Sequence, residues 1–329
     1  MKLHNKRAVV TGSSVSIGRS IAVLLAKEGA KVVINARGSG PRGIETIDAV
    51  VEEIRAGGGT AIGVPGAVNE PQFAEELIHR CVEAYGGIDI LINNAAIYST
   101  ESVGPVLDCS LEMWHRTLNV NLDSVFYTCR AALPYMVRQR WGRIINAGSF
   151  AGTGKMGGGA YCAIKSALFG LTRGMAADYG PYGITCNVYN PEAQSTMGDT
   201  YDPKILRAIL DFWLERGFRS SAENAYLSGL CGPEGTAPWV AYLCTDEAQY
   251  LNGRVMAVEG RRMALLAQPE EQHMLFQDYS KDGPISLDQL CLMAPLAFPV
   301  TNAWPRRTGD ALKRWESSRH PGSAAAKPS

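Results

Sequence analysis

Short apolar runs rich in Val and Ile alternate with longer helical patterns, and this alternation constrains the fold more than any other feature of the sequence. The runs that predict strands cover residues 7–11, 31–36, 61–64, 88–93, 142–147, 184–189 and 254–258. The helical patterns cover residues 17–29, 42–57, 70–85, 110–140, 160–180 and 236–246. Strands that are apolar throughout are buried on both faces, and helical connections between them favour a parallel arrangement. The sequence therefore predicts an α/β fold, a doubly wound parallel sheet of seven strands with helices on both faces.

The alternation stops near residue 260 of 329, and this sets the expected domain boundaries. We expect one α/β domain, a C-terminal extension and a disordered tail rich in Gly, Pro, Ser and Ala, over residues 1–262, 263–316 and 317–329 respectively. Inside the domain, residues 152–159 form a Gly-rich loop and residues 196–235 a long insertion before the last helix and strand.

The balance of charges argues against some classes of partner. Lys and Arg number 32, Asp and Glu also number 32, and the formal net charge is +0, so nothing favours nucleic acid or an anionic membrane. The N-terminus lacks a signal-peptide core, and no apolar run reaches the roughly 20 residues that span a bilayer. The eight cysteines and five histidines show no metal-ligand spacing. We expect a cytoplasmic protein that contacts no membrane and holds no metal.

A glycine-bearing turn follows the first predicted strand. Residues 11–18 read TGSSVSIG, and a helical pattern follows. Such a turn lets backbone N–H groups and a helix N-terminus face a pyrophosphate. The candidate contacts are Gly12, Ser14, Ser16, Ile17 and Gly18. Ser16 replaces the middle glycine of a TGxxxGxG pattern, where a Cβ can crowd the phosphate, and the alternative interpretation is a tight turn with a helix cap.

The end of the second predicted strand indicates the choice of cofactor. Residues 33–39 read VINARGS, without the acid that would bind a ribose 2′-hydroxyl. Arg37 is placed to meet a 2′-phosphate instead, so NADP(H) is favoured and NAD(H) is the alternative. Arg37 could equally be a solvated loop cation, with Arg42 in its place.

Two adjacent asparagines, Asn93 and Asn94, end the fourth predicted strand. In open α/β sheets, ligands bind at the carboxyl ends of the strands. These side chains either contact the ligand, hydrogen-bond the turn backbone, or do both.

The catalytic candidates surround a tyrosine and a lysine four residues apart, Tyr161 and Lys165. Residues i and i+4 share one face of a helix, so an ammonium can lower the pKa of a phenol, which is ordinarily near ~10, toward the working pH. A carbonyl that accepts a hydride needs such a proton donor. Ser149, at the end of a buried strand, can orient the substrate oxygen, and Asn121 is a polar residue in an otherwise apolar helix that needs a partner such as a backbone carbonyl or a water.

These motifs together resemble the short-chain dehydrogenase/reductase family of single-domain type. TGSSVSIG, NNAA, NVNL, INAGS, YCAIK and NPEAQST occur in the family's order and spacing over roughly residues 3–262. The resemblance implies a Rossmann-like fold and a catalytic tetrad of Asn121, Ser149, Tyr161 and Lys165. It also implies that Tyr161 and Lys165 touch the cofactor together with Val68, Asn93, Ala95, Pro191 and Thr196, the last at the nicotinamide carboxamide. Homodimers or homotetramers built through the helices near 110–140 and 160–180 are implied as well.

The chain also departs from the family pattern. Besides Ser16, NNAA replaces NNAG, Glu192 follows Pro191 in place of glycine, and Ala67 stands where an acid commonly contacts adenine. The tetrad is intact, so these changes bear on cofactor fit and specificity more than on activity. Residues 37–54 are similar, more weakly, to hydroxyacyl-CoA dehydrogenase domains.

Two functions from different classes follow. The first is an NAD(P)(H)-dependent oxidoreductase that interconverts a ketone and a secondary alcohol on a 3-oxoacyl or 3-hydroxyacyl thioester, a steroid-like or a polyketide-like substrate. The second is a catalytically silent nucleotide-binding scaffold, suggested by Ser16, Ala67 and Glu192. A predicted amphipathic helix over residues 203–218 would be either a lid for a hydrophobic substrate or a cover for the core or an interface. Extended-family epimerases are disfavoured by the glycine spacing and by the chain beyond the sixth strand.

Overall fold

The computed structural model describes residues 1–38, 44–99, 101–154, 159–191, 232–259, 262–266 and 289. Several predictions of the sequence lie outside these residues and are not addressed below. They concern Arg42, Glu192, Thr196, the helix expected over residues 203–218, most of the extension beyond residue 262, and the tail over residues 317–329.

The described residues form an α/β sheet of eight strands in the order β3-β2-β1-β4-β5-β6-β7-β8. The first seven are parallel and match the seven predicted runs: β1 (Arg7–Val10), β2 (Lys31–Ala36), β3 (Thr60–Pro65), β4 (Ile90–Asn93), β5 (Gly142–Ala147), β6 (Ile184–Pro191) and β7 (Val255–Glu259). The central strands are buried along their whole length, as expected for a sheet covered on both faces.

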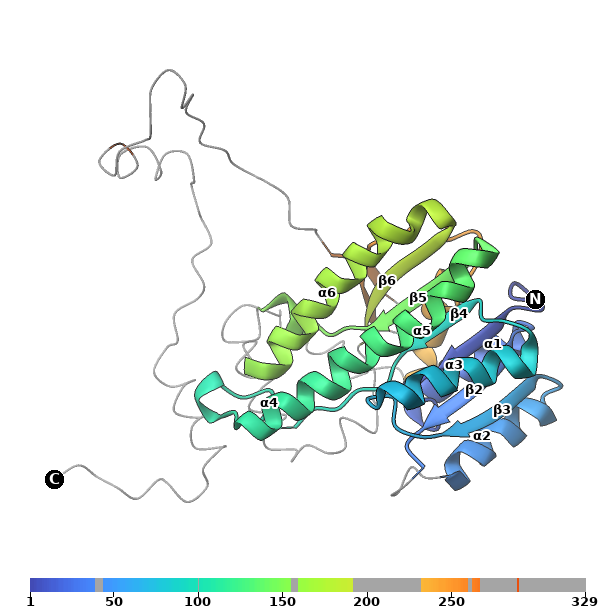
Figure 1. Cartoon of the computed structure of the whole chain (residues 1–329), viewed down its shortest axis with the longest axis horizontal. Coiled ribbons are helices and arrows are strands. Elements are labelled where there is room, and N and C mark those ends of the chain that lie inside the picture. The colour runs from blue at the N-terminus through green and yellow to red at the C-terminus, as the bar shows by residue number, and fades with distance from the viewer. Residues whose placement is uncertain are drawn as a thin grey trace.

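Helices cover both faces of this sheet (Figure 1). One face packs against α1 (Ser16–Lys27), α2 (Ile44–Ala56) and α9 (Ala237–Leu243). The other packs against α3 (Pro71–Tyr85), α5 (Ser124–Gln139) and α6 (Gly159–Tyr179). Burial of apolar side chains on both faces is the main force that holds these layers together, at about 25 cal/mol for each Å² of apolar surface removed from water. The predicted Rossmann-like architecture is confirmed.

The eighth strand, β8 (Arg262–Leu265), differs from the expected seven. It pairs antiparallel with β7, with Met256 opposite Leu265 and Val258 opposite Met263. An antiparallel neighbour needs no helical crossover, so the periodicity that identified the parallel strands gives no signal for it. The sheet thus continues past residue 262, where the alternation of the sequence ends.

The long helix expected over residues 110–140 is divided in two. An α-helix, α4 (Leu111–Leu118), passes through a π-helical turn, η2 (Asn119–Asp123), into α5. Short 3-10 turns complete the described elements: η1 (Val106–Asp108), η3 (Phe150–Thr153), η4 (Gly180–Tyr182) and η6 (Pro233–Gly235). A π turn widens the helix by one residue, and such turns are often found at functional positions.

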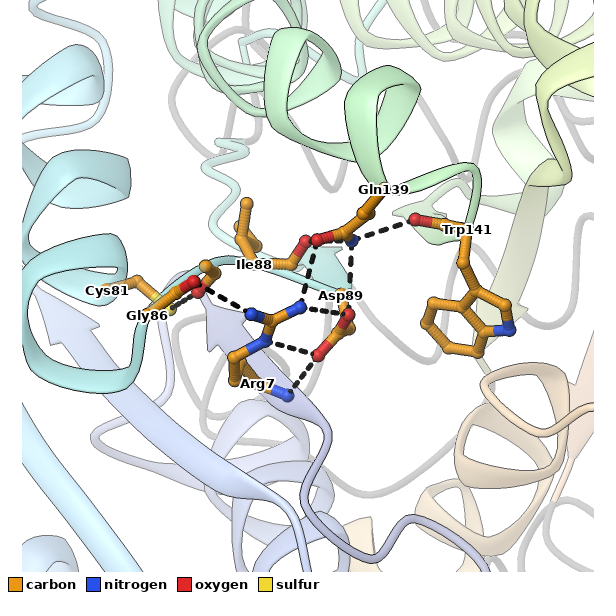
Figure 2. A network of polar contacts seen from close by, with 8 residues as sticks. Arg7, Cys81, Gly86, Ile88, Asp89, Gln139 and Trp141 are labelled. Carbon is orange, nitrogen blue, oxygen red and sulfur yellow. Dashed lines mark hydrogen bonds and ion pairs between the residues drawn. The ribbon is translucent and has the colours of Figure 1, made fainter.

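A buried polar network fastens the amino-end edge of the sheet (Figure 2). The Arg7 guanidinium donates to both carboxylate oxygens of Asp89, at 2.6 Å each, and its Nη2 also donates to Gln139. The Gln139 amide donates in turn to Asp89 and to the Ile88 and Trp141 carbonyl oxygens. A bidentate pair of this kind fixes geometry as well as energy. It ties β1, β4 and the end of α5 together.

The strand order places β1 beside both β2 and β4, so successive crossovers leave in opposite directions from this point. At such a switch point the loops at the carboxyl ends of the strands separate and leave a crevice in which ligands bind. In the described part of the chain, none of the helices has the length and apolar character that crossing a bilayer requires.

Candidate active site

The turn after β1 is built from positions that have no room for a side chain. Gly12 has φ +61°, and a Cβ there would lie 2.9 Å from the Cα of Ala95. Gly18 is buried in α1, and a Cβ on it would overlap the Gly12 carbonyl oxygen and crowd the Asn94 amide. Glycine is therefore required at both places. The close approach of backbone to backbone leaves the N-terminus of α1 unobstructed for a phosphate.

Ser16 occupies the first position of α1 with φ +53°, a conformation that costs free energy for any residue with a Cβ. Its hydroxyl oxygen is buried and has no hydrogen-bond partner among the described residues. Ser14, two residues before it, is also buried, and Ile17 packs against the core. The serine thus keeps the backbone shape that the family pattern gives to glycine.

The two loops that flank the switch point are joined through Thr11 and Asn94. The Thr11 hydroxyl oxygen accepts from the N–H groups of Asn94 and Ala95, each at 3.0 Å. The Asn94 amide donates to the Thr11 and Gly12 carbonyl oxygens, and its Oδ1 accepts from the Tyr189 hydroxyl at 2.8 Å. Asn94 therefore holds the turn backbone, one of the two roles expected for it.

The side chain of Asn93 takes part in a chain of buried hydrogen bonds between the sheet and the helices α5 and α6. Its amide nitrogen donates to Asn146 Oδ1 at 2.9 Å, and its oxygen accepts from the Thr128 hydroxyl at 2.7 Å. The Asn146 amide continues the chain to the Thr172 hydroxyl at 2.9 Å. All four residues are buried, and each bond removes a desolvation cost. These contacts tie β4 and β5 to α5 and α6.

The end of β2 carries the residue expected to choose the cofactor. Asn35, the residue before last in β2, is buried, and its amide donates to the Val64 and Gly66 carbonyl oxygens. Arg37 follows the strand and is exposed. Val68 is buried among the apolar residues beside α3. Arg37 stands at the carboxyl edge of the sheet, where a phosphate on the adenosine ribose could meet it.

Tyr161 lies near the start of α6, and its side chain is buried. Burial raises the pKa of its phenol above the ordinary value, the nearby Tyr98 raises it further, and a hydrogen bond with Ser149 acts in the opposite direction. Ser149 precedes η3 and accepts from the Ala151 N–H at 3.1 Å. The predicted pair of serine and tyrosine is therefore in contact.

Lys165 lies one turn further along α6 and is almost completely buried. Its Nζ donates to the Ala147 carbonyl oxygen at 2.6 Å and lies 5.6 Å from the centre of the Tyr161 ring. Burial lowers the pKa of this ammonium to about 7. A shift of this kind in a buried group beside a phenol marks Lys165 as a candidate site residue.

Asn121 sits in the π turn η2 and is buried. Its amide pairs with the backbone of Ile97 at both groups, accepting from the N–H at 3.1 Å and donating to the carbonyl oxygen at 2.9 Å. A further bond runs to the Thr117 carbonyl oxygen at 3.0 Å. The expected polar partner is thus a backbone segment that follows β4.

Two further residues at this edge were not predicted from the sequence to belong to the site. Tyr98 packs its ring on that of Tyr161. Asn190 is fully buried at the end of β6, and neither polar atom of its amide has a partner among the described residues. It faces Gly148, where any Cβ would overlap its Oδ1. Leaving such groups unpaired costs about 1–3 kcal/mol each, and a polar residue directly before Pro191 was the available sequence signal.

The structure gathers the predicted site at one edge of the sheet. Gly12, Gly18 and Ala95 meet at the switch point, and Ser149, Tyr161 and Lys165 meet beside β5. Pro191 ends β6 at the same edge. A dinucleotide fits this arrangement: the glycine cradle and α1 would receive its pyrophosphate, and Lys165 and Tyr161 its nicotinamide ribose.

Comparisons with known proteins agree with this geometry. The family model of short chain dehydrogenases matches residues 6–202. The chain is 33% identical over 258 residues to short-chain dehydrogenase/reductase eriH of Hericium erinaceus, covering 78% of this chain and 97% of that protein. It is 32% identical over 262 residues to 3-oxoacyl-acyl-carrier-protein reductase FabG of Staphylococcus epidermidis, covering 78% and 98%.

A solved structure shows the same likeness. The crystal structure of a short chain dehydrogenase from Burkholderia cenocepacia, in complex with NADP, has a TM-score of 0.64 and 32% identity, and covers 79% of this chain and 98% of that one. The match of more than half the chain places this chain in the short-chain dehydrogenase/reductase family as an NAD(P)-dependent oxidoreductase.

Proposed function

We propose that this protein interconverts a ketone and a secondary alcohol, with NADP(H) as the preferred cofactor, on a hydrophobic or acyl-type substrate. The observation that carries the proposal is the buried group of Ser149, Tyr161 and Lys165 at the carboxyl edge of the sheet. Proton transfer to or from a reacting oxygen needs a donor held within about 2.6–3.2 Å of it. Tyr161 is the one described phenol that is also hydrogen-bonded to Ser149.

Each of these residues has a separate part in the proposed reaction. The bound dinucleotide supplies or accepts the hydride. Tyr161 gives its phenolic proton to the developing alkoxide oxygen in reduction and takes it back in oxidation. Ser149 holds the substrate oxygen against the phenol. Lys165, when charged, lowers the pKa of the phenol and opposes the effect of burial, which raises it.

NADP(H) is preferred in this proposal because of the end of β2. No acid precedes Arg37 there, and an exposed guanidinium can bind a phosphate through two parallel hydrogen bonds. The related Burkholderia cenocepacia protein was solved with NADP. NAD(H) is the alternative cofactor. A measured preference for NAD(H) would mean that Arg37 is a solvated cation that does not bind the cofactor.

The substrate class rests on relatives. FabG of Staphylococcus epidermidis is a 3-oxoacyl-acyl-carrier-protein reductase, so an acyl thioester heads the candidates for this chain. Cyclic, steroid-like and polyketide-like ketones follow.

A homodimer or homotetramer is also proposed, formed through α4, α5 and α6. Leu111 on α4 and Phe126 on α5 are exposed large apolar side chains on the helices that the family resemblance assigns to subunit contacts. Exposed apolar groups of this size mark association surfaces when they gather on one face.

A catalytically silent scaffold is the second candidate, and Ser16 favours it. A residue with φ +53° and a buried, unpaired hydroxyl at the phosphate turn makes nucleotide binding less favourable than glycine would. Weak binding of both dinucleotides would be its signature.

The test is oxidation of NADPH and NADH by the purified protein against acetoacetyl thioesters, cyclic ketones and short aliphatic ketones. We expect turnover with NADPH above NADH, and binding of both measured by fluorescence titration. Arg37→Asp should shift the preference toward NADH, by about tenfold for each 1.4 kcal/mol of lost phosphate binding. An unchanged ratio removes Arg37 from the proposal, and silence with all substrates together with absent nucleotide binding supports the scaffold.

A further inference from the structure

Tyr98 brings a second aromatic ring against the catalytic one. The ring centres of Tyr98 and Tyr161 are 5.8 Å apart, and the ring planes are inclined by 55°. Aromatic pairs at this distance prefer inclined or offset arrangements and stabilise by about 0.5–1.5 kcal/mol beyond their buried area. Tyr98 is half-buried, and it lies five residues past the end of β4. The contact therefore restrains the orientation of the Tyr161 ring.

The segment that carries Tyr98 is anchored on one side by a tetrad residue. Asn121 hydrogen-bonds both the N–H and the carbonyl oxygen of Ile97, the residue directly before Tyr98. Two bonds from one buried amide fix the backbone in the way that a strand neighbour would. The π turn that carries Asn121 thus places Tyr98 as well.

The same segment is anchored on its other side to the start of α6. Ser99 and Ser102 exchange hydrogen bonds between their hydroxyl and N–H groups, at 2.8 and 3.1 Å. The Ser102 carbonyl oxygen then accepts from the N–H of Tyr161 at 2.9 Å. The backbone of the catalytic tyrosine and the loop that carries Tyr98 are therefore one hydrogen-bonded unit.

We propose that Tyr98 is a positioning residue for catalysis, which holds the ring of Tyr161 in the orientation that proton transfer requires. The proposal rests on the proposed function, because it concerns how Tyr161 performs its acid and base role. It adds a residue outside the tetrad. Tyr98 acts through Tyr161, and Asn121 acts on both through Ile97.

Three side chains from different elements act on the Tyr161 phenol in the described part of the chain. Ser149 lowers its pKa through a hydrogen bond, whereas Tyr98, from the segment after β4, raises it. Lys165, from α6, places its ammonium beside the ring, with Nζ 5.6 Å from the ring centre.

The test separates the ring of Tyr98 from its hydroxyl. Tyr98→Phe keeps the ring contact, so kcat at neutral pH should stay within about threefold of wild type. Tyr98→Leu removes the ring, and kcat should fall about 10- to 100-fold because a misplacement near 1 Å has effects of that size. The dissociation constant for NADPH, measured by fluorescence titration, should be unchanged in both.

Tyr182→Phe is the matched control, since Tyr182 is a partly exposed tyrosine beyond the far end of α6. It should match wild type in kcat, pH profile and NADPH binding. If Tyr98→Leu does not fold, Tyr98→Met, which also lacks the ring, takes its place. A variant without the ring that keeps full kcat, or a Tyr98→Phe enzyme that loses as much kcat as Tyr98→Leu, overturns the inference. Failure of the proposed function is distinguishable, because the wild-type protein would then turn over none of the ketones, or Tyr161→Phe would turn over as fast as wild type.

Discussion

The turn after β1 and the cluster between β5 and α6 lie at the same edge of the sheet, yet they are built from different chemical groups. The turn is formed by backbone atoms, and there is no space for a Cβ at Gly12 or Gly18. The cluster consists of buried side chains, Tyr161 and Lys165, whose polar atoms have specific partners. In the proposed function, the first region binds the cofactor by shape and the second transfers the proton.

This difference predicts how each region responds to change. In the cluster, a side chain can lose one atom and keep its packing, so turnover can fall while the stability of the fold is unchanged. In the turn, a Cβ added at Gly12 or Gly18 would meet backbone atoms, so we expect binding and stability to change together. Three variants test the comparison, from the largest expected effect to the smallest.

The largest effect is expected from Tyr161→Phe. The ring and its contact with Tyr98 remain, and only the phenolic oxygen is lost. Turnover should fall about 10²- to 10⁴-fold, the usual contribution of a positioned acid or base. NADPH binding and the melting temperature should stay close to wild type. Retained turnover would refute Tyr161 as the acid and base.

Gly18→Ala should show the opposite combination. The added methyl group overlaps the Gly12 carbonyl oxygen, so the turn must shift or the helix must move. We expect a loss of about 1–3 kcal/mol in the free energy of unfolding, as for other overpacked sites, together with weaker NADPH binding. Gly170→Ala is the control, because a Cβ at that helical glycine meets nothing within 4 Å. Normal NADPH binding and stability in Gly18→Ala would show that the turn adapts.

The third variant concerns Lys165, which makes the free energy of unfolding depend on pH. Its effect for each pH unit is the smallest of the three. Burial lowers its pKa in the folded protein to about 7, against an ordinary value of 10.5. Between these values the unfolded chain binds more protons, so this residue makes the protein more stable as pH rises through the window, by at most about 1.4 kcal/mol per pH unit. Below pH 7 both states are charged and the full destabilisation is present.

Urea unfolding of the cofactor-free protein and of Lys165→Met, from pH 6 to pH 10, measures this contribution. The methionine variant should be the more stable one near pH 6, and its advantage should shrink toward pH 10. A difference that does not vary with pH would mean that the Lys165 ammonium is not desolvated. A buried charge would then no longer distinguish the cluster from the turn.

Much of the fold and of the tetrad could be predicted from the sequence. The seven apolar runs became seven parallel strands, because strands buried on both faces must be apolar throughout. Tyr161 and Lys165 share a helix face because helical spacing is local. These features depend on neighbours within a few residues, which a sequence displays directly.

Other features depended on residues far apart in the chain. Asn93 was expected to meet a ligand or a turn, but its amide bonds Asn146 and Thr128 across the sheet and helix layers. The strand β8 adds an antiparallel edge for which the parallel pattern gives no signal. The contact of Tyr98 with Tyr161 joins segments 63 residues apart in number, through Asn121 and Ser102.

The sequence by itself determined the α/β layering, the glycine turn on the first strand and the presence of all four tetrad residues, since each follows from periodicity or from motifs of a few residues. Only the tertiary structure decided what those residues touch. Ser149 meets Tyr161, Lys165 donates to the Ala147 carbonyl oxygen and Asn121 holds the backbone that carries Tyr98. The reason is physical: a buried polar group takes the partners that packing brings to it, and packing joins elements whose separation in the chain leaves no trace in local pattern.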